Sequence, residues 1–181
     1  MILWRISRHR DLSGAGGLRA PGRWHDAGHP IVYLAETPAA ALLEVCVHTS
    51  ANDVPPDFTL LRIEGPALRI RSIQPKNLPE NWRGHPEATR VIGTAWLTKA
   101  ETALLRVPSA LVPETSNYLF NPAHKDAAKF RIAETSLRRA PEEVTPTPAS
   151  SRRLYRNPAI AENARQRSFE VPCPFPAKLF A

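Results

Sequence analysis

The amino-acid sequence predicts a single mixed α/β domain of the α+β kind. The chain has 181 residues, a length that suits one compact domain and is short for two. Its hydrophobic fraction of 43% and charged fraction of 23% are close to those of average globular proteins. Stretches with strand-like patterns alternate with two stretches of helical spacing. The 19 prolines predict numerous loops and short elements, so we expect few long helices.

Several stretches have the composition and alternation of β-strands. We expect strands at residues 2–7, 29–36, 58–65, 67–73, 103–112 and 127–134. The glycine-rich stretch 13–24 is expected to be an extended loop. In the strand 29–36, the two-residue repeat points Tyr33 to the face opposite Val32 and Leu34. Tyr33 therefore has a defined direction within the predicted sheet.

A helix is predicted to begin at Thr37 and Pro38 and to run to about His48. Threonine can accept hydrogen bonds from the free amides of the first turn, and proline at the first position lacks an amide. Glu44 is the only ionisable residue in the apolar part of this helix. Because a helix that is apolar all round is normally buried, Glu44 is expected to be a buried carboxylate with a special role. A second helix is expected over 88–100, as part of the scaffold.

The domain organisation follows from changes of composition along the chain. Residues 1–134 form the predicted core domain. Residues 135–168 are rich in arginine and proline with few large apolar side chains, which predicts an inserted or surface arm. Residues 169–181 are apolar again and are expected to complete the core as a strand-like segment.

The net charge of +7 and pI near 10.0 favour an anionic substrate or an acidic partner surface. Cys46 and Cys173 have neither metal-ligand spacing nor a disulfide-rich context. The sequence has no recognisable leader and no apolar run long enough to cross a bilayer. We therefore expect a cytoplasmic protein without a membrane span.

Several common enzyme motifs are absent from the sequence. It contains no GxxxxGK loop, no GxSxG elbow, no HExxH and no paired CxxC. The glycines of 14–17 lack the spacing of a dinucleotide-binding loop. The histidines have no arrangement that suggests ligands, so no metal site is expected. What remains is a set of polar residues in apolar surroundings.

Two stretches of the chain resemble the RES domain family of bacterial toxins. They are GRWHDAGHPIVYLAETPAAALLEVCVH and TSNYLFNPAHKDAAKFRI, and with the WRI near the start they cover roughly residues 3 to 134. The order and spacing of these stretches are together specific for the family. The resemblance implies an ADP-ribosyltransferase-like domain with a central antiparallel or mixed sheet. It also implies that NAD is consumed as a substrate and that no metal takes part.

The resemblance also implies which residues form the NAD site. Its catalytic positions are Arg23, Tyr33, Glu44 and Ser116, and Arg5, Asn117 and Asn121 are expected to help bind NAD. An arginine suits the pyrophosphate, and an aromatic ring suits the cationic nicotinamide. A carboxylate can stabilise an oxocarbenium-like ribose. From the residues alone, Arg23 could instead form a structural ion pair and Tyr33 could be an ordinary core aromatic.

Three functions are compatible with the sequence. The leading prediction is a toxin that cleaves the nicotinamide–ribose bond by hydrolysis or phosphorolysis. The second is transfer of ADP-ribose to a protein. The third is a basic nucleic-acid-binding module without catalysis. The resemblance implies an antitoxin partner with an Xre-type helix-turn-helix region, through which any contact with DNA would be indirect.

Overall fold

The computed structural model describes residues 1–48, 57–112 and 114–139. The strands are β1 (Ile2–Ile6), β2 (Val32–Ala35), β3 (Asp57–Glu64), β4 (Arg71–Ser72), β5 (Leu104–Pro108), β6 (Ser116–Phe120) and β7 (Arg131–Arg139). The α-helices are α1 (Gly16–Arg19), α2 (Pro38–His48) and α3 (Pro86–Lys99), and two short 3-10 helices are η1 (Pro75–Asn77) and η2 (Ala127–Lys129).

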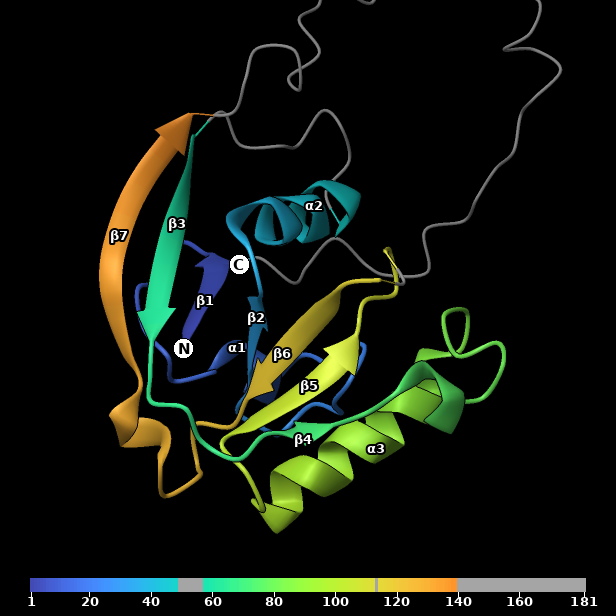
Figure 1. The fold of residues 1–181 in the computed structure, drawn as a ribbon. Helices are drawn as coiled ribbons and strands as arrows, with labels where there is room; N and C mark the ends of the chain where they lie inside the picture. The colour runs from blue at the N-terminus through green and yellow to red at the C-terminus, as the bar shows by residue number, and fades with distance from the viewer. Residues whose placement is uncertain (49–56, 113, 140–181) are drawn as a thin grey trace, which may run out of the picture.

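The strands form one sheet in the order β4-β5-β6-β2-β1-β3-β7 (Figure 1). All neighbouring pairs are antiparallel except β4 and β5, which are parallel. The mixed α/β class and the central, mainly antiparallel sheet are therefore confirmed. Strands β1, β2 and β3, which follow one another in the chain, lie side by side. Strand β6 pairs with β2 and β7 pairs with β3, so these two pairs join strands that are far apart in sequence.

The sheet has two faces, each covered by its own core. On one face, Leu105 and Leu119 pack with Trp96 and Leu97 of α3, and we call this the α3 face. The opposite face, here called the reverse face, is packed around Leu34 and Phe120 and by Phe130 from the segment after η2. Tyr33 belongs to the α3 face and Val32 and Leu34 to the reverse face, as the two-residue repeat predicts. The sheet thus separates residues that are adjacent in sequence.

Most predicted elements are present, with some differences. The loop 13–24 contains the short helix α1, and the expected strand 67–73 is reduced to the two residues of β4. Residues 116–120 form strand β6, which the sequence pattern did not predict. Strand β7 continues past residue 134 to Arg139, because it pairs with β3 along its whole length. The rest of 135–168 and all of 169–181 lie outside the described residues.

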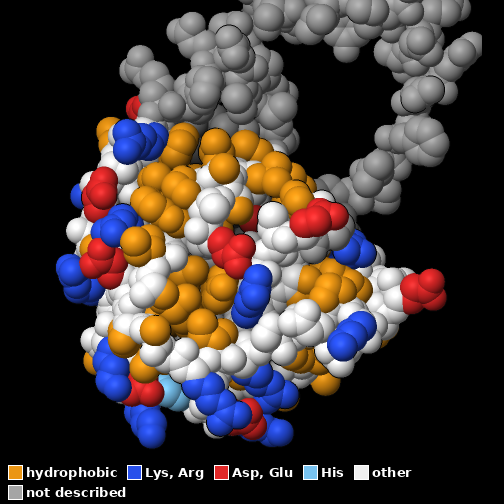
Figure 2. Space-filling model, in the orientation of Figure 1, with side chains coloured by type: hydrophobic (Ala, Val, Ile, Leu, Met, Phe, Trp, Pro, Cys, Tyr) orange, Lys and Arg blue, Asp and Glu red, His pale blue; other side chains and the backbone are white. Residues whose placement is uncertain are grey.

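Helix α2 begins and ends as predicted but is not buried as predicted. The Thr37 hydroxyl accepts a hydrogen bond from the Ala40 amide at 3.1 Å, as expected of a cap. However, Leu43 is 41% exposed and Val47 is 48% exposed, so the prediction of a helix buried all round is wrong for the part of the chain that is described. Figure 2 shows apolar side chains on the surface in the region of α2. The main contacts of the helix with the sheet are with β1 and β2.

Gly93 of α3 is predicted to be intolerant of a side chain. A Cβ atom there would overlap the carbonyl oxygen of Trp24, in the loop before β2. Exchanging glycine for alanine inside a helix normally stabilises the helix. A decrease in the free energy of unfolding would therefore indicate the close contact between α3 and the loop. We expect Gly93→Ala to lower the free energy of unfolding by about 1–3 kcal/mol, the usual cost of overpacking, measured by urea denaturation.

Gly84→Ala is the matched control for this prediction, because the nearest atom to a Cβ at Gly84 is 3.7 Å away. Its free energy of unfolding should stay within about 0.5 kcal/mol of that of the unsubstituted protein. A Gly93→Ala protein as stable as the control would show that the loop and α3 are not in close contact.

Candidate active site

The loop that carries Arg23 is fixed to α3 through its backbone. The Thr89 hydroxyl donates to the Arg23 carbonyl oxygen at 2.5 Å, and Arg90 Nε donates to the Gly22 carbonyl oxygen at 2.8 Å. Farther along the helix, the Asp26 amide donates to Thr94 Oγ1 at 3.0 Å. Thr89, Arg90 and Thr94 therefore act as side-chain partners for a segment that lacks regular secondary structure. The position of Arg23 follows from the position of α3.

Tyr33 fixes the same loop from the side of β2. Its hydroxyl accepts a hydrogen bond from the Trp24 amide at 3.1 Å and lies 2.9 Å from Nδ1 of His25. His25 Nε2 lies 3.1 Å from the Ala20 carbonyl oxygen, which can only accept, so Nε2 must carry the proton. Nδ1 is then the acceptor, and the Tyr33 hydroxyl donates to it. Burial raises the pKa of Tyr33 above its ordinary value, which keeps this donor protonated.

The contacts of Tyr33 leave no space beside Gly22. A Cβ on Gly22 would lie 2.6 Å from the Tyr33 hydroxyl oxygen and 2.7 Å from Cε1 of His25. The hydroxyl of Tyr33 is thus used inside the protein. Its function at the site would depend on the aromatic ring, as the sequence predicts for a nicotinamide contact.

Arg23 is half-buried, and its Nη1 donates to the Arg83 carbonyl oxygen at 2.9 Å. Burial lowers the pKa of its guanidinium, and the charge of Glu44 is the largest influence that raises it. The two charged side chains are therefore near enough to interact, although they come from a loop and from α2. This proximity agrees with the predicted grouping of Arg23, Tyr33 and Glu44.

Glu44 is held by two polar side chains on the α3 face. Asn117 Nδ2 donates to Glu44 Oε1 at 2.7 Å, and the Ser109 hydroxyl lies 3.4 Å from the same oxygen. The Ser109 oxygen also accepts the amides of Leu111 and Val112 at 3.1 and 3.2 Å. Because both acceptor positions of that hydroxyl are used, its proton is directed to Glu44. The carboxylate is therefore oriented by Asn117 and Ser109.

Ser109 contacts Glu44, although the sequence interpretation did not include it among the candidate site residues. It is 3% exposed and follows β5 directly. The available signal was the same one that identified Glu44, because Ser109 is a single polar residue within the apolar run VPSALV. A serine in such a run needs hydrogen-bond partners when it is buried.

Ser116, which the sequence interpretation assigned to catalysis, lies away from Glu44. Ser116 pairs with Pro108, one position from the Asn117–Val107 pair, so Ser116 and Asn117 point to opposite faces of the sheet. On the reverse face the Ser116 hydroxyl accepts from Arg106 Nε at 2.9 Å. Ser116 and Arg106 line a cavity of about 250 Å³. The catalytic assignment of Ser116 stays a prediction.

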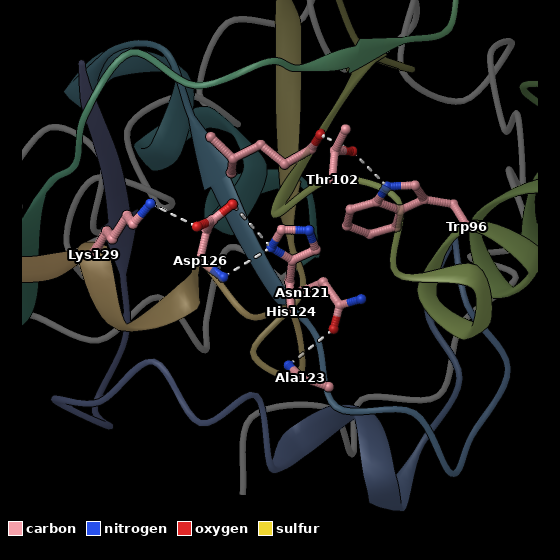
Figure 3. A network of polar contacts seen from close by, with 8 residues as sticks. Trp96, Thr102, Asn121, Ala123, His124, Asp126 and Lys129 are labelled. Atoms are coloured by element: carbon pink, nitrogen blue, oxygen red, sulfur yellow. Dashed lines mark hydrogen bonds and ion pairs between the residues drawn. The ribbon is translucent and has the colours of Figure 1, made fainter.

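Arg5 and Asn121 are also placed outside the group around Glu44. Arg5 pairs with Leu61 of the reverse-face core and donates to the Asp11 carbonyl oxygen at 3.2 Å. Asn121 is 1% exposed, and its side-chain amide nitrogen donates to the Leu97 carbonyl oxygen at 3.1 Å. Its side-chain oxygen accepts from the Ala123 amide at 3.0 Å (Figure 3). The structure thus gives the Asn121 side chain partners within the protein.

Two negative findings concern the described residues. They contain no group of three or more His, Cys, Asp or Glu side chains that could hold a metal ion. No helix within the same ranges is long and apolar enough to cross a membrane.

Comparison with known proteins places this chain in a family. The model of the RES domain matches residues 2–144, which is most of the chain. The chain belongs to the RES domain family. A RES relative from Pseudomonas putida, named Toxin Res, is 49% identical over 134 residues, which are 73% of this chain and 92% of that protein.

Two further similarities extend this result. A protein of Sphingobium sp. named Prs ADP-ribosylating toxin is 43% identical over 68% of this chain and 84% of its own. The crystal structure of the M. tuberculosis MbcT-MbcA toxin-antitoxin complex contains a chain with a TM-score of 0.64 and 19% identity, covering 76% of this chain and 84% of that one. At that identity the structural likeness shows a shared fold with this RES domain.

The His25–Tyr33 contact predicts a pH dependence of stability. Burial lowers the pKa of His25 from its ordinary 6.5 to about 4, so the folded protein keeps this histidine neutral where the unfolded chain binds a proton. The contribution of neutral His25 to the free energy of unfolding is complete above pH 6.5 and is lost as the pH falls toward 4. We expect the free energy of unfolding to decrease over this range, as measured by urea denaturation.

In His25→Asn the asparagine oxygen can still accept from Tyr33, but the titrating group is gone. The pH profile of this variant should be shallower between pH 4 and 6.5 than that of the unsubstituted protein. Parallel profiles would contradict a neutral, buried His25.

Proposed function

We propose that this RES domain cleaves the nicotinamide–ribose bond of NAD and acts as the toxin of a bacterial toxin–antitoxin pair. The observation that carries the proposal is the orientation of Glu44 by Asn117 and Ser109 on the face that also holds Tyr33 and Arg23. The name Toxin Res of the P. putida relative supports the biological role. Family membership disfavours a non-catalytic nucleic-acid-binding module.

Each residue of the group has a chemical role in this proposal. The bond between C1′ of the ribose and the nicotinamide nitrogen breaks, and its electron pair stays on the nitrogen, which neutralises the pyridinium. Positive charge develops on the ribose, and the Glu44 carboxylate stabilises it. Asn117 and Ser109 keep that carboxylate in one orientation, which lowers the cost of reorganisation. Tyr33 offers its ring to the nicotinamide, and Arg23 offers its guanidinium to the pyrophosphate.

The acceptor of the ADP-ribose group distinguishes the two enzymatic possibilities. Attack by water on the ribose gives ADP-ribose and a proton, and attack by phosphate gives the 1-phosphate of ADP-ribose. The name of the Sphingobium relative, an ADP-ribosylating toxin, favours a protein acceptor as the second candidate. Nicotinamide release measured with and without phosphate, together with transfer of adenine-labelled NAD to cellular protein, separates these acceptors.

We further propose that the partner is an antitoxin with an Xre-type helix-turn-helix region and that the toxin acts in the cytoplasm. The likeness of the fold to a chain of a toxin-antitoxin complex supports an antitoxin partner. In this proposal the antitoxin binds the operator DNA, and this chain contacts DNA only through it.

Glu44→Gln should abolish nicotinamide release from NAD. The amide keeps the size of the side chain but removes the negative charge that stabilises the ribose. We expect kcat to fall by at least about 100-fold, in the range found when a charge-stabilising group is removed from an active site, measured by chromatography of nicotinamide. The thermal unfolding midpoint should change little, because Glu44 is only half-buried.

Glu134→Gln is the matched control, since Glu134 is an exposed carboxylate on β7. It should retain the kcat of the unsubstituted protein. Undiminished turnover in Glu44→Gln would overturn the assignment of Glu44.

Ser109→Ala and Ser116→Ala separate the two serines. Ser109 donates to Glu44, whereas Ser116 bonds to Arg106 on the reverse face. We propose that Ser109→Ala lowers kcat by about 10-fold or more, while Ser116→Ala stays within about twofold. The kinetics of nicotinamide release by both variants decide which serine supports catalysis. A larger loss of kcat in Ser116→Ala than in Ser109→Ala would contradict the role of Ser109 and favour Ser116.

A further inference from the structure

We infer that Arg90 of α3 is a second cationic ligand, beside Arg23, for the diphosphate of NAD. The inference rests on the proposed function and adds a residue to its substrate site. The sequence interpretation expected Arg5 to help bind NAD, but the strand register pairs Arg5 with Leu61 of the reverse-face core. Arg90 is held instead next to the loop that carries Arg23.

The position of Arg90 is fixed by one of its own hydrogen bonds. Its Nε donates to the carbonyl oxygen of Gly22 at 2.8 Å, and Gly22 directly precedes Arg23. Gly22 in turn lies against the hydroxyl of Tyr33. This bond uses the Nε donor and orients the planar guanidinium, whose two Nη groups are the donors that bind phosphate oxygens in pairs.

The charge of Arg90 is not neutralised by an ion pair within the described residues. The nearest acidic residue along the helix, Glu87, is bonded to His85 at 2.8 Å, and the Glu87 side chain is mostly solvent-exposed. The charge of Arg90 is only the smallest of the causes that lower the pKa of Glu87. Asp26, across the loop, is bonded to the Thr94 hydroxyl at 3.2 Å. Arg90 therefore adds a positive charge beside that of Arg23.

The charge of Arg90 acts unfavourably on the Arg23 guanidinium. Burial is the main cause of the lowered pKa of Arg23, and the charge of Arg90 lowers it further. The charge of Arg90 also acts on Tyr33 and His25, which places it near the loop and β2. A doubly charged diphosphate between the two arginines would remove this repulsion and would satisfy the remaining donors.

Arg90→Gln is the variant that tests the inference. Glutamine keeps an amide donor for the Gly22 carbonyl oxygen but removes the charge. We expect KM for NAD to rise about tenfold with kcat changed by less than about twofold, because diphosphate binding is shared by the ground state and the transition state. The dissociation constant of ADP, measured by calorimetry, should rise by a similar factor, whereas that of nicotinamide, which has no phosphate, should not change.

Two further variants keep the result interpretable. Arg90→Lys retains the charge without the planar fork and should bind ADP more tightly than Arg90→Gln. Arg138→Gln removes one charge from an exposed position on β7 and should leave KM and ADP binding unchanged.

The inference is overturned if Arg90→Gln binds ADP as well as the unsubstituted protein does, or if its ADP and nicotinamide affinities fall together. Failure of the proposed function gives a different result, namely no nicotinamide release by the unsubstituted protein. The ADP measurement needs no turnover and decides the role of Arg90 in either case.

Discussion

The attachment of the Gly22–Asp26 loop to α3 and β2 is the constraint on which the rest of the site depends. The loop has no regular structure of its own, and side chains of Thr89, Arg90 and Thr94 satisfy its backbone from one side. Tyr33 does so from the other. Glycines at the two closest approaches, Gly22 and Gly93, make this possible because a Cβ at either would overlap its neighbours. Arg23 therefore reaches the site through packing, not through a position in a strand or helix.

The antiparallel sheet supplies the second half of the arrangement. Pairing of β2 with β6 and of β6 with β5 brings Asn117 and Ser109 to the face where Glu44 of α2 lies. A shift of one residue in β6 would exchange Asn117 for Ser116 and leave the carboxylate without its strongest donor. The orientation of the Glu44 carboxylate is thus tied to strand register, although Glu44 itself is on a helix.

Much of the fold and part of the site could be predicted from local sequence signals. The start of α2, the alternation of β2 and the isolated Glu44 are local patterns, and the structure agrees with the first two in detail. The exposure of α2 could not be predicted, because it depends on which tertiary neighbours cover an apolar helix. The group formed by Ser109, Asn117 and Glu44 joins residues up to 73 positions apart. No local pattern shows that Ser109, and not Ser116, lies on the α3 face with Glu44.

The most direct test of the proposed NAD site is a crystal structure of the Glu44→Gln protein with intact NAD. In the proposed site the nicotinamide ribose lies beside side chain 44, the nicotinamide lies against the Tyr33 ring and the diphosphate lies between Arg23 and Arg90. NAD bound on the reverse face, in the cavity lined by Arg106 and Ser116, would contradict it.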